Sequence, residues 1–73
     1  MTVQPGRYRH FKGREYIVLG VAQHSESGEE LVVYQQDYGP RGLWVRPVGM
    51  FLETVDVAGR ETPRFQWLSP ADA

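Results

Sequence analysis

The chain has 73 residues, which is enough for one domain and too few for two. It contains no cysteine, which excludes disulfides and thiolate metal sites, so two Trp, four Tyr and three Phe must carry much of the core packing. The net charge is −1, with eight basic and nine acidic residues. This balance argues against sequence-independent nucleic-acid binding, which depends on Lys and Arg neutralising phosphates.

Two strands are predicted at the start of the chain, Arg7–Phe11 and Glu15–His24, joined by a tight turn at Lys12-Gly13. The second segment is rich in β-branched and aromatic residues and has no proline. Such a run is typical of a long strand that is buried on both faces in its middle. Gly20 within it indicates a bend or a close approach of another backbone.

A hairpin is predicted next, because residues 25–29 contain Ser-Gly between two apolar runs. Its return strand is Glu30–Gln36. Side chains alternate along a strand, so Val32, Tyr34 and Gln36 share one face. The following residues, 37–42, include two glycines and a proline and are predicted to form a loop.

The second half of the chain predicts short elements around Pro47, which lacks the N–H that strand pairing needs and suits the start of a helical turn. The elements are expected in this order: strand Leu43–Arg46, a helical or 3₁₀ turn at 47–51, strand Leu52–Val57, a turn at 58–60, a last extended segment Thr62–Leu68 and a flexible tail at 69–73.

Five to six short strands with glycines at the corners predict an all-β (mainly β) domain. Its architecture is expected to be a small SH3-like barrel or a strongly bent antiparallel sheet. The barrel is a likeness at the level of the fold and carries no function by itself. We expect a single domain over residues 1–73, ordered at about 6–68.

The sequence also bears on where the protein acts. Met1–Arg9 has no apolar run, so no signal peptide is expected. The longest apolar stretch, Ile17–Ala22, is too short to span a bilayer. Together with the absence of cysteine, these features predict a cytoplasmic protein without a membrane partner.

Several segments, taken together, resemble a known bacterial family. They are Gly6-x-Tyr8-x-His10-x-Lys12-Gly13, Ala22-x-His24-Ser25-Glu26-x-Gly28-Glu29, Val32-Val33-Tyr34-Gln35, Leu43-Trp44-Val45-Arg46-Pro47, Met50-Phe51 and Pro63-Arg64-Phe65. The family consists of small stand-alone proteins and is catalogued as Domain of Unknown Function 1653. The resemblance covers nearly the whole chain and implies no particular activity, cofactor or catalytic residue.

The two histidines, His10 and His24, are the first candidates for chemistry. A metal site usually needs three protein ligands, and the glutamates near His24, such as Glu26, match no known metal spacing. His24-Ser25-Glu26 has the residue types of a hydrolase triad, but sequence neighbours on a strand point to opposite faces. We therefore expect both histidines to be strand-end residues bonded to backbone or solvent, with no catalytic residue, metal or cofactor.

A set of aromatic residues and one arginine is the stronger candidate. Tyr34, Tyr38, Trp44 and Arg46 lie on or beside two strands predicted to be neighbours, and Trp44 and Arg46 share a face expected to point away from the core. Arginine stacks on flat rings and forks onto carboxylate or phosphate, so this face suits a flat or anionic ligand. The alternative is that Trp44 fills the thin core and Arg46 makes an internal hydrogen bond or ion pair.

Three functions follow from these residues. The first is a binding module for a peptide, a nucleotide-like ligand or a partner protein. Its hypothetical ligand-binding residues are Tyr34, Gln35, Trp44, Arg46, His10, His24 and Glu26. The second is an assembly or structural subunit, such as a weak homodimer, formed through a β edge or the segment containing Phe65 and Trp67. The third is a small enzyme or metal protein that depends on His10, His24 and Glu26.

Overall fold

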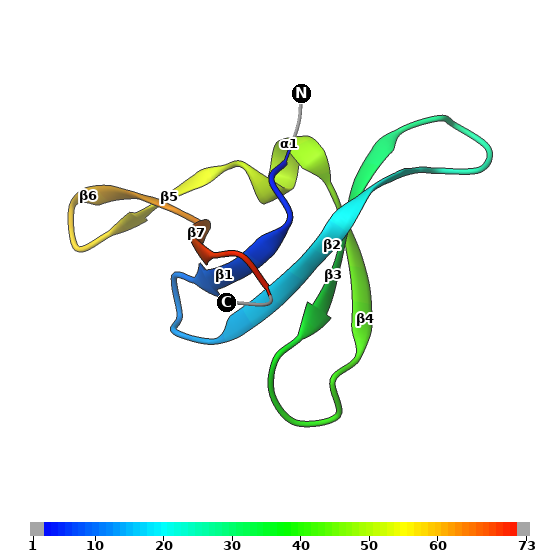
Figure 1. The fold of residues 1–73 in the computed structure, drawn as a ribbon. Coiled ribbons are helices and arrows are strands. Elements are labelled where there is room, and N and C mark those ends of the chain that lie inside the picture. Colours follow the sequence, from blue (N-terminus) through cyan, green and yellow to red (C-terminus); the bar gives the residue numbers. More distant parts are fainter. Residues whose placement is uncertain (1–2, 72–73) are drawn as a thin grey trace.

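A computed structural model describes residues 3–71 and contains seven strands and one short helix in that range (Figure 1). The elements are β1 (Gly6–His10), β2 (Glu15–Gln23), β3 (Glu30–Gln36), β4 (Leu43–Pro47), α1 (Val48–Phe51), β5 (Thr54–Val57), β6 (Arg60–Pro63) and β7 (Phe65–Ser69). The prediction of a mainly β domain is confirmed.

The strands form two antiparallel sheets. Five of them make one sheet in the order β4-β3-β2-β1-β7, and β5 and β6 form a separate hairpin that projects to one side (Figure 1). The outer strands β4 and β7 do not pair with each other, so the large sheet is not closed into a barrel. Of the two predicted architectures, the bent antiparallel sheet is therefore the one observed.

The last extended segment, predicted as a single strand at Thr62–Leu68, is divided into β6 and β7 at Arg64. The Arg64 N–H donates to the carbonyl of Glu53 at 3.0 Å, and its own carbonyl accepts from the N–H of Phe11 at 2.9 Å. These two bonds lead the chain from the hairpin to the edge of β1. The segment continues to Ser69, inside the predicted tail, while residues 72–73 of that tail lie outside the described residues.

The helical turn predicted at 47–51 is present as α1. Pro47 is both the last residue of β4, opposite Leu31, and the N-cap of this helix. Val48 and Phe51 are three positions apart, so they lie on one side of the turn, and both are buried. Among residues 3–71, no helix is long and apolar enough to cross a membrane.

Strand β2 differs from its prediction in burial. Val18 is buried, but Leu19 is exposed, so the strand is not covered on both faces. A domain of this size has too little chain to build a core on each side of a sheet. The predicted irregularity at Gly20 is confirmed, because the pairing of β2 with β3 shifts register between Val18 and Gly20.

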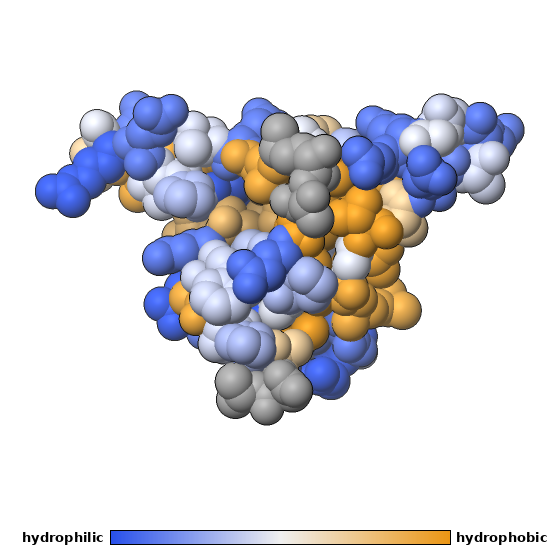
Figure 2. Space-filling view, turned by 45° about the horizontal axis from the view of Figure 1, so that its top comes forward, coloured by the Kyte–Doolittle hydropathy of each residue, from blue (hydrophilic) through white to orange (hydrophobic). Residues whose placement is uncertain are grey.

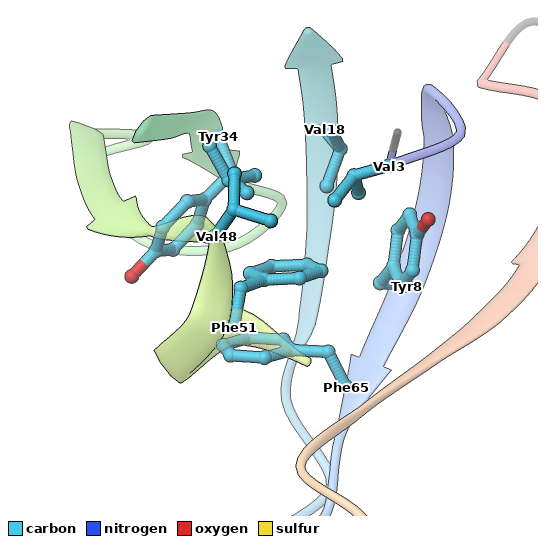
Figure 3. Close-up of a cluster of buried hydrophobic side chains, with 8 residues drawn as sticks. Val3, Tyr8, Val18, Tyr34, Val48, Phe51 and Phe65 are labelled. Carbon is cyan, nitrogen blue, oxygen red and sulfur yellow. The ribbon is translucent and has the colours of Figure 1, made fainter. Parts of the chain in front are cut away.

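The core lies on one face of the large sheet, and half of its eight residues are aromatic (Figure 3). Phe51 and Phe65 stack with their ring centroids 4.3 Å apart and an angle of 6° between the rings. Tyr8 meets Phe51 edge-on at 5.3 Å, and Tyr34 lies 5.7 Å from Phe65. The helical turn and β7 thus bring one phenylalanine each to the centre of the sheet.

Candidate functional site

An open pocket of about 220 Å³ lies on the core side of the sheet, where strands β2, β3 and β4 meet the loop that follows β3. Its lining residues are Tyr16, Tyr34, Gln36, Tyr38, Trp44 and Arg46. All four residues of the predicted aromatic and arginine set are thus brought together in it: Tyr34, Tyr38, Trp44 and Arg46.

Strand register explains why these residues converge. Tyr34 on β3 lies opposite Trp44 on β4, and Gln36 lies opposite Tyr16 on β2. Residues directly opposite each other in an antiparallel pair project to the same face and are in contact distance. Arg46 follows on the same face because it lies opposite the buried Val32.

The prediction that Trp44 and Arg46 point away from the core is wrong. Their partners across the strand pair, Tyr34 and Val32, are both core residues, so the pair occupies the core side of the sheet. Trp44 nevertheless keeps 54% of its surface exposed, because β4 is an edge strand of the sheet. Trp44 therefore forms a wall of the pocket and does not fill the core.

The predicted alternative for Arg46, an internal ion pair, is not observed either. No carboxylate in the described part of the chain pairs with its guanidinium, whose Cζ lies 5.7 Å from the centre of the Phe65 ring. Its Nε is buried and has no hydrogen-bond partner among residues 3–71. A buried donor without a partner is unusual and calls for an explanation.

Two tyrosines form the wall opposite Trp44. The hydroxyl oxygens of Tyr16 and Tyr38 are 2.9 Å apart, and the Arg14 guanidinium lies 4.5 Å from the centre of the Tyr38 ring. Burial, followed by the bond to Tyr38, raises the pKa of Tyr16 to about 12. Hydrogen bonds with Tyr16 and Gln36 lower the pKa of Tyr38.

Gly42 holds the loop close to the pocket. Its N–H donates to Oε1 of Gln36 at 2.9 Å. A Cβ atom at this position would lie 3.0 Å from that oxygen and 3.4 Å from Nε1 of Trp44. The absence of a side chain therefore lets the loop pack against both pocket residues.

Several arginines outside the pocket are neutralised by carboxylates. Arg7 pairs with Asp37 and lies 3.8 Å from Glu15, Arg9 lies 3.1 Å from Glu15, and Arg41 lies 2.9 Å from Asp37. Arg7 belongs to the opposite face of the sheet, because its neighbour Tyr8 is a core residue. The carboxylates of Asp37 and Glu15 thus form ion pairs with all three of these arginines.

Basic residues near Phe65 lack such partners. His10 packs against Phe65 at 4.9 Å, and its pKa is lowered by burial and by the positive charges of Arg64, Lys12 and Arg46. Arg64 has no carboxylate partner in the described part of the chain, and its Nε, like that of Arg46, is buried without a hydrogen bond there. Arginine charges without an ion pair therefore act together on His10, although the chain as a whole carries −1.

The remaining residues of the predicted binding set lie elsewhere. Gln35 faces the side opposite to Tyr34, and its Nε2 donates to the carbonyl of Arg41 at 3.0 Å. His24 and Glu26 are exposed in the β2–β3 hairpin, where Nδ1 of His24 accepts from the N–H of Glu26 at 3.1 Å. His10 lies near the pocket, at the other end of β2 from His24.

The histidines behave as predicted from their positions at strand ends. Nδ1 of His10 accepts a bond from the N–H of Lys12 at 3.1 Å, which matches the backbone bond made by His24. Within residues 3–71, no three His, Asp or Glu side chains gather closely enough to hold a metal ion.

Two residues of the site were not singled out from the sequence: Tyr16, which lines the pocket, and Arg14, whose guanidinium lies on the Tyr38 ring. Tyr16 has a usable signal, because it lies two positions before Val18 and so shares its face. Arg14 has none, because it lies in the turn before β2. Its proximity to the pocket arises only from the tertiary fold.

Comparison with known proteins identifies one protein family that this chain matches. A search of the curated proteins found no match. The chain is similar to the crystal structure of a protein of the DUF1653 family from Bordetella bronchiseptica, with 37% identity, a TM-score of 0.87 and coverage of 94% of this chain and 91% of the other. The family model described as "Protein of unknown function (DUF1653)" matches residues 6–67. The chain therefore belongs to the DUF1653 family of small β domains.

Proposed function

We propose that this protein is a binding module whose pocket takes one flat, polar ring of a small, nucleotide-like ligand. The observation that carries the proposal is the half-exposed Trp44 facing the hydrogen-bonded pair of Tyr16 and Tyr38 across an open pocket. Aromatic walls of this kind bind bases and similar rings by stacking.

The size of the pocket limits what it takes. Pockets that enclose a whole small molecule usually measure about 300–1,000 Å³. A volume of about 220 Å³ matches a single ring system, with the rest of the ligand lying outside. The pocket is open to solvent and Arg46 is one of its lining residues, so that remainder would lie outside it within reach of the arginine.

The lining also suits a polar ring better than an apolar one. Tyr16 and Tyr38 offer hydroxyl groups, and the half-exposed Trp44 offers ring surface. A nucleobase satisfies both kinds of surface, because it has flat faces for stacking and hydrogen-bonding groups on its edge.

The test is a ¹⁵N-HSQC titration of the intact protein with four nucleosides and with short peptides containing one aromatic residue. We expect saturable shifts at Tyr34, Trp44 and Arg46 with a nucleoside, and their loss in Trp44→Ala. Trp67→Ala is the matched control, since Trp67 is also partly exposed, at 38%, but lies on the opposite edge strand. If a folded Trp44→Ala protein still binds the nucleoside as tightly as the unmodified protein, the proposal is wrong. If only the peptides cause shifts, the pocket is a peptide-binding site and the proposed nucleotide-like ligand is wrong.

A second candidate function is self-association through β4. This edge strand exposes Leu43 and Val45 at 64% and 58%, and its outer backbone groups have no neighbouring strand. Figure 2 shows hydrophobic surface in the middle of the molecule, next to the hydrophilic end of the β2–β3 hairpin. Exposed apolar residues on an edge strand promote pairing between copies. Sedimentation equilibrium across a range of concentrations tests it: Val45→Lys should weaken any dimer, and a monomer at every concentration would exclude this role.

A further inference from the structure

The group of basic side chains beside the pocket has no counter-charge in the described chain. Arg46 and Arg64 each keep a buried Nε without a hydrogen bond, and both charges act on His10, which packs on the same Phe65 ring that Arg46 approaches. The arginines Arg7, Arg9 and Arg41, by contrast, are all paired with carboxylates. Arg14 and Arg60 also have no ion pair in the described part of the chain, so what distinguishes Arg46 and Arg64 is that each has a buried Nε without a hydrogen bond and that both charges act on the same histidine.

From this arrangement we infer that Arg46, Arg64 and His10 form an anion subsite beside the pocket, and that it takes the phosphate group of the ligand whose ring enters the pocket. The inference rests on the proposed function and narrows its ligand to a phosphorylated one. A nucleoside monophosphate has the required combination of a ring and a phosphate.

The chemistry of the two guanidinium groups favours an oxyanion. Arginine donates through Nε and a terminal nitrogen in a fork that matches two oxygens of a phosphate. The Nε atoms of Arg46 and Arg64 are donors without a partner among residues 3–71, and both are buried, so each side chain would turn to present its fork to an oxyanion. Its charge would also offset the repulsion between the two guanidinium groups, and the neutral His10 ring, whose Nδ1 accepts from the N–H of Lys12, has its Nε2–H left to donate.

Arg46 connects the two parts of the proposed site. It lines the pocket together with Trp44, and its guanidinium lies over Phe65, against which His10 packs. One side chain therefore borders both the ring pocket and the anion subsite. A ligand held at both places would carry its anionic group close to its ring, as a nucleotide does.

Phosphate is a better match than a carboxylate for this subsite. A phosphate monoester carries about −1.5 to −2 charges near neutral pH and offers three acceptor oxygens, enough to engage two forks at once. A single carboxylate carries one charge and two oxygens. The presence of two arginines and a histidine around one place therefore indicates the larger anion.

The experiment compares each nucleoside with its 5′-monophosphate, and both with inorganic phosphate, by ¹⁵N-HSQC titration at fixed ionic strength. We expect the monophosphate to bind about tenfold or more tightly than the nucleoside, since a charge-assisted hydrogen bond contributes on that scale. Arg64→Gln should abolish this preference and leave nucleoside binding unchanged. Arg60→Gln is the matched control, because Arg60 is an exposed arginine in the β5–β6 hairpin that has no ion pair in the described chain.

The outcomes separate this inference from the proposed function. If the nucleoside binds as tightly as its monophosphate, the anion subsite is refuted. It is also refuted if the preference for the monophosphate persists in Arg64→Gln. In both cases the proposed ring pocket is still supported. Binding of inorganic phosphate with shifts at His10, Phe65 and Arg64, but no binding of any nucleoside, supports the subsite and refutes the ring pocket. If phosphate and monophosphates both leave these resonances unmoved, the subsite does not exist.

Discussion

The hydroxyl oxygens of Tyr16 and Tyr38 lie 2.9 Å apart, and their hydrogen bond ties strand β2 to the loop that follows β3. Arg14 covers the outer face of this contact, with its guanidinium 4.5 Å from the Tyr38 ring. The wall of the pocket opposite Trp44 is therefore fixed from both sides. The pKa values of these two tyrosines give the first prediction.

Tyr38 is expected to lose its proton before Tyr16 when the protein is titrated with base. The pKa of Tyr16 is raised from 10.0 to about 12, whereas hydrogen bonds lower that of Tyr38. Because the folded-state pKa of Tyr16 is raised, its contribution to stability is complete below pH 10 and is lost as the pH rises towards 12. Following the ¹³Cζ shifts of the tyrosines checks this, and equal titration of the two residues would contradict it.

His10 is expected to titrate below the ordinary histidine pKa of 6.5. Burial is the main cause, and the charges of Arg64, Lys12 and Arg46 add to it. Arg64→Gln should therefore raise the pKa of His10, while Arg60→Gln should leave it unchanged. Since the folded-state pKa is depressed, the stability that His10 contributes is present above pH 6.5 and is lost as the pH falls through the folded-state value. A ¹H–¹³C NMR titration of the imidazole measures both effects.

Phe51→Ala is expected to destabilise the domain by about 3–5 kcal/mol, because it removes a fully buried ring and leaves a cavity. Phe51 is 1% exposed and stacks on Phe65. Its helical neighbour Met50 is 47% exposed, so Met50→Ala should change stability by only about 0.5 kcal/mol or less. Chemical denaturation measures both, and similar losses in the two variants would refute the assignment of the core.

Gly6→Ala is expected to destabilise more than Gly13→Ala, although both positions have positive φ, at 141° and 103°. A Cβ at Gly6 would lie 2.6 Å from the carbonyl oxygen of Ser69 and 2.7 Å from Nε1 of Trp67, whereas one at Gly13 meets nothing within 4 Å. Backbone strain costs about 1–3 kcal/mol at either site, and the close approach of β7 adds to it only at Gly6. Thermal unfolding of the two variants gives the difference, which should be clearly larger for Gly6.

Local patterns in the sequence predicted much of the fold. The bounds of Glu30–Gln36 agree with β3, because an alternating run of this kind is bounded by clear turn residues on both sides. The helical turn after Pro47 and the irregularity at Gly20 were also predictable, since proline and glycine act through their own backbone preferences.

Long-range features were harder to predict. Whether the outer strands close into a barrel depends on the path of the chain through Arg64, which bonds to Glu53 and Phe11 from distant parts of the sequence. The face of Trp44 was assigned wrongly because alternation fixes which residues share a face, but not which face meets the core. Tyr34, Trp44 and Arg46 were grouped correctly for the same reason, since grouping needs only the alternation and one strand pairing.

The central claim, that the pocket binds a flat ring, is tested most directly by the two tryptophan indole N–H resonances. Trp44 lines the pocket, whereas Trp67 lies on the far edge strand with its Nε1 bonded to the carbonyl of Pro5 at 3.3 Å, so one reports on the site and the other serves as an internal reference. Titration with the nucleosides and their monophosphates should move the Trp44 resonance to saturation and leave Trp67 in place. A Trp44 resonance that stays fixed across the whole panel, or that moves only in step with Trp67, would contradict the account.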